Sequence, residues 1–345
     1  MQTINRIRTI RNAVLIALAT VGTAQAGTLT IESWRVDDKT LWETVLIPAF
    51  QKKNPGIEVK FAPTAPTEYD SSLTARLAGG TAGDLIACRP FDVSLSLYKK
   101  GNLEKLDGKP GMEHFPASSK TAWQTDDGKD TFCMPVASVM HGFLYNQKIF
   151  KELNLQPPKT EAEFFKVLDT IKSNGKYTPL ALGTADQWES SQVVFTGVGP
   201  NYWKGEEGRK ALIAGKEKFT DPNFVNAFEY EAKLGKYLSK GASSQTYGDS
   251  QNLFALGKAA IYPTGSWDIA YFNTNAKFEM GASRRQCLKP ATNAISPITT
   301  ISAWASTRNP RTRKMHTSSW PGLVRRNSPT SIPTRSPASS RCRTT

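Results

Sequence analysis

The chain has 345 residues and a formal net charge of +14, which is enough length for two domains and suggests a nucleic acid or membrane surface as partner. The charge is confined to the two ends, however. Three Arg stand near the start, and the segment after residue 282 holds ten Arg, two Lys and no acidic residue. The region between them is close to neutral, and no RRM, KH, zinc-finger or helix-turn-helix pattern is present. We therefore expect no nucleic-acid partner.

Residues 1–26 have the three parts of a secretory signal peptide. A basic start is followed by a short apolar run, Ala13–Val21, and by a small-x-small cleavage site, Ala24–Ala26. The apolar run is too short to span a bilayer. No Cys follows the cleavage point, which argues against a lipid anchor there. We expect the mature protein to begin at Gly27 and to be exported; a buried N-terminal helix is the alternative.

Two of the four Cys, Cys88 and Cys133, lie in the central region. In an oxidising compartment they could form a disulfide, but two separated Cys are also compatible with two buried free thiols. The three His and the lack of an HExxH or paired CxxC pattern argue against a zinc site. We expect neither a metal nor a cofactor.

The first part of the mature chain alternates strands with helices. Thr28–Trp34 alternates apolar and polar residues, as in a strand with one buried face, and apolar residues at helical spacing follow over residues 41–50. A strand over residues 57–61, a helix over residues 69–77 and a buried strand, Leu85–Ala87, come next. This order predicts right-handed βαβ units and a mostly parallel sheet. We assign residues 27–137 to a first α/β lobe.

A second α/β lobe, residues 138–282, is expected to follow. Met134–Asn146 is an extended apolar run that would cross between the lobes. Thr160 and Glu163 form a capping box for a helix, and Thr178–Leu182 has the pattern of a strand. A long helix is expected to begin near residue 221, so this lobe is richer in helix.

The stretch Ile261–Asp268, with the sequence IYPTGSWD, has the pattern of a strand-to-helix junction. Pro263 and Gly265 would end a short buried strand, and Ser266 can cap a helix that begins near Trp267. Such a junction leaves backbone N–H groups and a large ring at the edge of a sheet, where open α/β sheets bind ligands. The alternative for this Trp is a place in the core.

Four segments carry a resemblance to a known family: Leu46–Val59 (LIPAFQKKNPGIEV), Ala75–Ile86 (ARLAGGTAGDLI), Gly142–Phe164 (GFLYNQKIFKELNLQPPKTEAEF) and Asn252–Asp268 (NLFALGKAAIYPTGSWD). With them the chain resembles the extracellular solute-binding proteins of bacterial ABC sugar importers, of the maltodextrin- and raffinose-binding type. One departure is Gly83, where the family usually has Pro before the acid. The resemblance implies a two-lobed periplasmic binding protein fold with a hinge between the lobes. It also implies a periplasmic monomer that closes on a sugar and delivers it to a membrane permease.

Sugars present apolar faces to aromatic rings and hydroxyl groups to planar polar side chains. Residues of these types lie where loops would face the cleft between the lobes: Trp34, Arg35, Asp84, Arg89, Phe91, Asp92, His141, Trp188, Glu189, Gly265, Trp267 and Asp268. Asp84 matches the acid of the family's second motif. Structural alternatives stay open: covering the first helix for Trp34, a core position for His141, a turn cap for Asp84, and a surface ion pair for Arg89.

The segment from Ser283 to Thr345 differs in character from the rest. Its apolar residues are sparse and without period, so we expect an aberrant basic tail that is disordered and forms no core. A one-base frameshift at the Ala282–Ser283 junction is our preferred hypothesis, because shifting the frame turns Asn309–Arg341 into an acid-bearing, helix-like sequence that resembles the family's C-terminus. Without that segment a lobe would expose apolar surface.

The leading functional hypothesis is a periplasmic sugar-binding component of an ABC transporter, not an enzyme. A binding protein for another polar solute, such as a polyol or a sugar phosphate, is one alternative, although Arg35 and Arg89 are thin support for a phosphate site. A secreted carbohydrate-active hydrolase is another and would need two carboxylates flanking one bond. The chain has no GxSxG, HExxH or P-loop motif to favour an enzyme.

Overall fold

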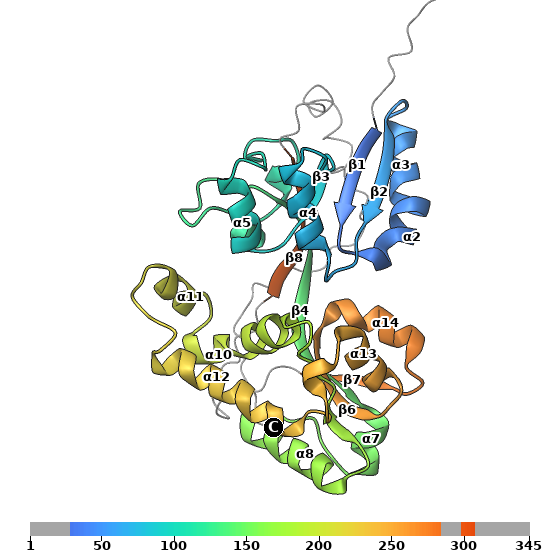
Figure 1. The fold of residues 1–345 in the computed structure, drawn as a ribbon, viewed down its shortest axis with the longest axis vertical. Coiled ribbons are helices and arrows are strands. Elements are labelled where there is room, and N and C mark those ends of the chain that lie inside the picture. Colours follow the sequence, from blue (N-terminus) through green and yellow to red (C-terminus); the bar gives the residue numbers. More distant parts are fainter. Residues whose placement is uncertain (1–27, 284–297, 308–345) are drawn as a thin grey trace, which may run out of the picture.

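A computed structural model describes residues 28–283 and 298–307, and for residues 298–303 the backbone alone. Two α/β lobes lie one above the other and are joined by extended strands (Figure 1). A single path of hydrogen-bonded strands runs through both lobes in the order β2-β1-β3-β8-β4-β6-β5, with β7 also paired to β4. The expected two-lobed α/β fold is confirmed.

The first lobe is built on the predicted βαβ units. Strand β1 (Thr28–Ser33) pairs in parallel with β2 (Glu58–Pro63) and with β3 (Leu85–Cys88). Its helical segments are η1 (Val36–Asp38), α2 (Lys39–Leu41), the π-helical η2 (Trp42–Leu46), α3 (Ile47–Lys53), α4 (Tyr69–Ala78), α5 (Asp92–Lys99), η3 (Met112–His114), α6 (Ala117–Lys120) and η4 (Thr121–Trp123).

The second lobe is richer in helix, as predicted. Strand β6 (Ala259–Gly265) lies parallel to β5 (Thr178–Leu180), and β7 (Met280–Ser283) lies antiparallel to β4 (Met134–Asn146). The capping box of Thr160 and Glu163 is present at the start of α8. The helical segments are α7 (Gln147–Glu152), α8 (Glu161–Asn174), the π-helical η5 (Glu189–Phe195), α9 (Thr196–Val198), α10 (Pro200–Trp203), α11 (Glu206–Ile213), α12 (Pro222–Leu234), η6 (Gly235–Tyr237), η7 (Ala242–Ser244), α13 (Tyr247–Ala255), η8 (Ser266–Asp268) and α14 (Ile269–Asn275).

Strand β4 crosses between the lobes, as expected for this apolar run. Residues Met134–Met140 pair with β8 (Ile298–Ser306) in the first lobe, and His141–Tyr145 pair with β6 in the second. The boundary that we assigned between residues 137 and 138 falls inside this strand. Strands β4 and β8 run antiparallel to their neighbours, so among the described strands three pairings are parallel and four antiparallel. The expectation of a mostly parallel sheet is therefore wrong.

One part of the tail also differs from its expected disorder. Strand β8 lies in the sheet between β3 and β4, and the ring of Trp304 is buried against Trp42, with 5.3 Å between the ring centroids. The strand opens on Ile and Thr, β-branched residues that favour strands, and the sparse apolar content of the whole tail concealed it. The aberrant character therefore does not extend unbroken from Ser283. The frameshift hypothesis otherwise concerns residues outside the described ranges and stays a prediction.

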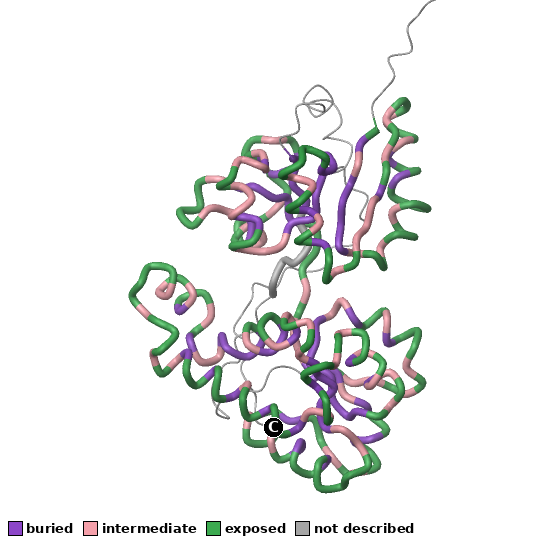
Figure 2. The backbone as a smooth tube through the Cα atoms, viewed as in Figure 1, coloured by how far each residue is buried: buried purple, intermediate pink, exposed green. Residues whose placement is uncertain are grey.

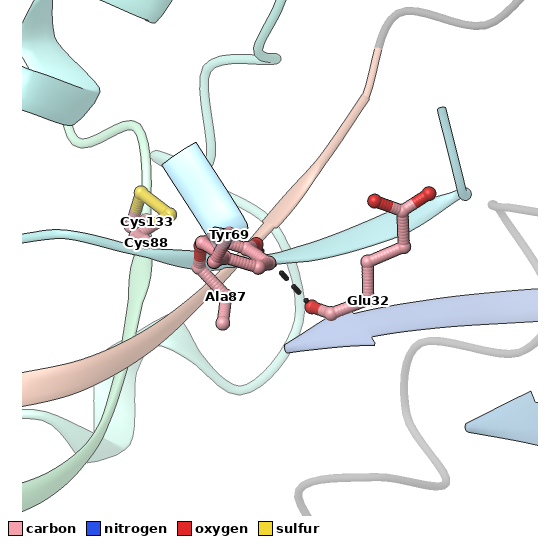
Figure 3. The surroundings of a disulfide bond; sticks show 5 residues. All are labelled: Glu32, Tyr69, Ala87, Cys88 and Cys133. Carbon is pink, nitrogen blue, oxygen red and sulfur yellow. Dashed lines mark hydrogen bonds between the residues drawn. A yellow bond between two sulfur atoms is a disulfide. The ribbon is translucent and has the colours of Figure 1, made fainter. Parts of the chain in front are cut away.

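Cys88 and Cys133 form a disulfide, which settles the two readings that the sequence left open. The bond joins the end of β3 to the residue just before β4, and both Cys are fully buried in the first-lobe core. Figure 3 shows the neighbouring Tyr69, whose hydroxyl lies 2.8 Å from the carbonyl oxygen of Ala87 and 3.4 Å from that of Glu32. The disulfide thus holds the start of the crossing strand against the first-lobe sheet.

The buried residues follow the strands of each lobe, and exposed residues cover the outer helices (Figure 2). In the part of the chain that the structure describes, no helix is long and apolar enough to cross a membrane.

Candidate functional site

Two of the predicted residues of the first lobe, Trp34 and Arg89, follow the carboxyl ends of β1 and β3. Trp34 is buried, its ring edge-to-face with Tyr69 at 5.4 Å between centroids. The guanidinium of Arg89 covers the ring of Trp34, 4.2 Å from its centroid, and donates to Asp70 at 3.2 Å and to the carbonyl oxygen of Pro66 at 2.9 Å. The indole is therefore a packed residue of the lobe, as the structural alternative had it, and Arg89 covers it.

Arg35 lies at the same edge and is partly exposed. It donates to Asp37 at 2.6 Å and to Asp38 at 3.2 Å. Burial works to lower the pKa of Arg35, but these two carboxylates outweigh it and raise the pKa. Tyr247 of the second lobe is a further, smaller cause of the raised pKa of Arg35.

Asp84 has a structural contact within the first lobe, and its role as a ligand residue stays a prediction. It lies at the start of β3 and is only 5% exposed. Its Oδ2 accepts a hydrogen bond of 2.7 Å from the backbone N–H of Thr30, which ties β3 to β1. The acid of the family motif therefore lies between two strands and accepts a backbone hydrogen bond through one of its two oxygens.

Phe91 and Asp92 begin α5 at the edge that faces the second lobe. Phe91 has φ +58° and ψ −130°, a backbone conformation that side chains other than Gly rarely adopt. Asp92 is exposed. The ring of Phe91 contacts Arg209, which lies on α11 of the second lobe. Strain at a cleft loop is a frequent mark of a functional position.

In the second lobe, four aromatic side chains meet beside the crossing strand. We call them the aromatic cluster: His141, Trp188, Tyr247 and Trp267. Trp188 lies edge-to-face with Tyr247, with 4.8 Å between centroids, and His141 lies edge-to-face with Trp267 at 5.1 Å. All four are half-buried. Gly265, at the end of β6, lies directly beneath the Trp267 ring, which is the physical reason for a Gly there.

Asp268 is buried and contacts the aromatic cluster through Tyr247. It accepts hydrogen bonds from Tyr247, from Thr264 and, at 2.9 Å, from Gln251. Burial raises the pKa of Asp268, and these hydrogen bonds oppose the rise. Burial likewise raises the pKa of Tyr247, with the charge of Asp268 as the next cause. Asp268 therefore positions the phenol ring rather than facing solvent.

Glu189 begins η5 next to Trp188 and is 2% exposed. Burial raises its pKa to about 8, the charges of Asp186 and Asp268 add to the rise, and a hydrogen bond from Ser250 opposes it. Among the described residues its Oε1 has no hydrogen-bond partner. At neutral pH the group is a protonated carboxyl, a hydrogen-bond donor as well as an acceptor.

Four of the second-lobe residues predicted as ligand contacts lie close together in the structure, and their central neighbour is a residue that the prediction did not include. The structure brings Trp188, Glu189, Trp267 and Asp268 together around Tyr247, which we did not predict. A signal was present: Thr246 and Asp249 form a capping box that starts α13 and sets Tyr247 in its first turn. Arg209 was missed because nothing in its own helix indicates a contact with the other lobe.

The sequence matches the model of a protein family described as bacterial extracellular solute-binding protein over residues 35–284. The multiple sugar-binding protein of Streptococcus mutans is 28% identical over 247 residues, which cover 68% of this chain and 57% of that protein. An uncharacterized ABC transporter extracellular-binding protein of Pyrococcus horikoshii is 26% identical over 230 residues, 64% of this chain and 52% of that protein. The aligned chain spans little more than half the length of these relatives.

Solved structures share the two-lobed fold. One, from work on xylan utilization by Caldanaerobius polysaccharolyticus, has a TM-score of 0.74 at 21% identity, covering 86% of this chain and 78% of that one. RafE in complex with raffinose has a TM-score of 0.68 at 22% identity, with coverages of 87% and 78%. At such identities the likeness concerns the fold.

Proposed function

Since this chain belongs to the bacterial extracellular solute-binding proteins, we propose that it captures a sugar in the periplasm and delivers it to the membrane permease of an ABC importer. Two relatives support the choice of a sugar: one is named a multiple sugar-binding protein, and RafE was solved with raffinose. The family and these relatives are binding proteins rather than enzymes.

The aromatic cluster is the observation that carries the proposal. Trp188, Tyr247 and Trp267 come from three different elements and meet, half-buried, beside the strand that joins the lobes. Rings held in this way suit the apolar C–H faces of a pyranose, and each also carries a polar tip. The buried hydrogen bond from Tyr247 to Asp268 fixes the orientation of that ring before a ligand arrives, which reduces the ordering cost of binding.

Polar groups on both lobes would complete the recognition of hydroxyl groups. The protonated carboxyl of Glu189 can donate to a hydroxyl as well as accept from one. Across the cleft, Arg35 and Asp92 are partly or fully exposed at the facing edge of the first lobe. A sugar between the lobes would contact both of them, so its binding would favour their closure.

The remaining expectations belong to the same proposal. A signal peptide cleaved after Ala26 would export the chain to the periplasm; it lies outside the described residues. The working form would be a monomer without a cofactor, with the permease and the sugar as its partners.

The test is a titration of the mature protein with a sugar panel, followed by intrinsic Trp fluorescence and calorimetry. The panel contains raffinose, stachyose, maltotriose, xylotriose and chitotriose, with mannitol and glucose 6-phosphate as the polyol and phosphate alternatives. The variant Trp267→Ala should weaken binding of the preferred sugar about tenfold or more. Trp203→Phe is the control, because Trp203 is buried against Phe224, away from the aromatic cluster. A folded protein that binds none of the sugars, or that cleaves them, contradicts the proposal.

A further inference from the structure

The two lobes touch at a contact that lies apart from the crossing strands. The Cζ atom of Arg209, on α11 of the second lobe, lies 4.6 Å from the centroid of the Phe91 ring, at the start of α5 in the first lobe. In Figure 1, α11 extends from the second lobe on the side where α5 lies. A guanidinium within about 6 Å of a ring centroid is attracted by the negative face of the ring.

The first-lobe partner is held firmly. The backbone of Phe91 has positive φ, and its N–H donates a 2.9 Å hydrogen bond to the carbonyl oxygen of Ala122 in η4. Its ring also packs against the first-lobe core. A non-Gly residue persists in this conformation only where its surroundings impose it. The ring is therefore fixed to the first lobe and moves with it.

The second-lobe partner is oriented within its own helix. Glu206, one turn before Arg209, accepts from its Nε at 2.8 Å and from its Nη2 at 2.6 Å. Gly208 lets α11 approach α10 so closely that a Cβ there would stand 1.9 Å from the carbonyl oxygen of Trp203. The guanidinium is thus directed toward the first lobe rather than swinging freely.

Charge on the first lobe favours the same contact. The pKa of Arg209 is raised first by its hydrogen bond to Glu206, and the carboxylates of Asp92 and Asp126, both in the first lobe, add to the rise. The guanidinium of Arg209 is therefore attracted both by the Phe91 ring and by the charges of Asp92 and Asp126.

The crossing strands leave the lobes room to move. The pairing of β4 with β8 shifts register between Pro135 and Ala137 and again between Ala137 and Ser138. Val136, Ala137 and Ser138 are exposed at this point. Such irregularities bend a strand and disrupt its hydrogen-bond ladder locally. A contact outside the strands can therefore influence how far apart the two lobes lie.

We propose that Arg209 and Phe91 form a latch that holds the lobes of the ligand-free protein in the arrangement described here. The contact exists only when the lobes are this close, so it stabilises this arrangement over more widely separated ones. At this exposure a cation–π contact changes an equilibrium constant about two- to fivefold. The latch needs no sugar, so it stands or falls separately from the proposed function.

The test is small-angle X-ray scattering of the ligand-free mature protein, fitted as a mixture of this arrangement and separated-lobe forms. Arg209→Gln should raise the ratio of separated to approached molecules about two- to fivefold, and Arg209→Lys, which keeps the charge but not the planar group, should fall between. Lys210→Gln is the matched control: it makes the same charge change on the next, exposed residue of α11 and should leave the ratio unchanged. Equal scattering of Arg209→Gln and Lys210→Gln would overturn the latch.

A double-mutant cycle with Phe91→Leu makes the assignment of the partner specific. If the ring is the partner of the guanidinium, Arg209→Gln has no further effect once Phe91 is Leu. An undiminished effect in that background overturns the proposal. Helix content and melting by circular dichroism identify any variant that fails to fold. In that case Glu206→Gln, which retains both the ring and the guanidinium, gives a second measurement. The ratio of separated to approached molecules should rise because the guanidinium loses its orientation, and an unchanged ratio would contradict the latch.

Discussion

The Trp267 ring lies directly on the backbone of Gly265: a Cβ built at this Gly would stand 1.9 Å from Cζ3 of the indole. No real Cβ approaches a ring so closely, so the indole can occupy this position only because residue 265 is Gly. The same indole lies edge-to-face with His141 of the crossing strand. The position of one ring therefore depends on a residue without a side chain two places earlier.

Gly265→Ala should displace the indole and weaken sugar binding about tenfold, while crowding costs about 1–3 kcal/mol in the free energy of unfolding. Calorimetric titration with the preferred sugar and urea unfolding measure the two effects. The control is Gly235→Ala, because nothing lies within 4 Å of a Cβ at Gly235 and its φ of −51° suits Ala. If Gly265→Ala bound the sugar as tightly as the wild type, the Trp267 ring would not belong to the binding site.

The buried carboxyl of Glu189 predicts a pH dependence. Its pKa is about 8 in the folded protein against an ordinary value of 4.5, so the folded state binds more protons than the unfolded state between these values. The contribution of Glu189 to the free energy of unfolding should be largest below pH 4.5, fall as the pH rises from there to about 8, and stay constant above it. Urea unfolding from pH 6 to 9 checks the slope. In Glu189→Gln that part of the decline should vanish; an unchanged slope would refute the assignment.

Removal of the disulfide should destabilise the first lobe. Cys88 and Cys133 are 45 residues apart in sequence, and replacing both with Ala frees a loop of that length in the unfolded chain. We expect a loss of about 2–4 kcal/mol in the free energy of unfolding. Chemical unfolding of oxidised protein and of the double variant measures it. Because both sulfurs are buried, mild reductant should leave the native wild type oxidised, and rapid reduction would show that this part of the lobe opens easily.

Strand β8 should be needed for the first lobe. A chain that ends after Thr307 keeps the strand, whereas one that ends after Pro297 leaves the facing edges of β3 and β4 unpaired and Trp42 without Trp304. We expect the shorter chain to lose at least about 3 kcal/mol of stability, or to aggregate through the open edges. Melting curves and size-exclusion chromatography compare the two. Equal behaviour would show that the strand contributes nothing.

Much of the fold could be predicted because its elements carry local signals. Periodicity located the strands and helices of both lobes, and Thr160 with Glu163 located the start of α8. The antiparallel course of β4 and β8 could not be predicted, because it depends on pairings between distant segments. In the candidate site, sequence position pointed to three members of the aromatic cluster but not to Tyr247, and the hydrogen bond from Thr30 to Asp84 left no local pattern. The contact of Arg209 with Phe91 was beyond prediction for the same reason.

The place of β8 in the sheet has a consequence for how the chain folds. The hydroxyl of Thr307 donates to the carbonyl oxygen of Gly83, 224 residues earlier, and the strand that ends there fills the position between β3 and β4. The first lobe is therefore completed by a segment that is synthesised after β7 of the second lobe. Pairing over such a distance is slow to form. A nascent chain that cannot finish its first lobe stays unfolded longer, which would suit the proposed export of an unfolded chain.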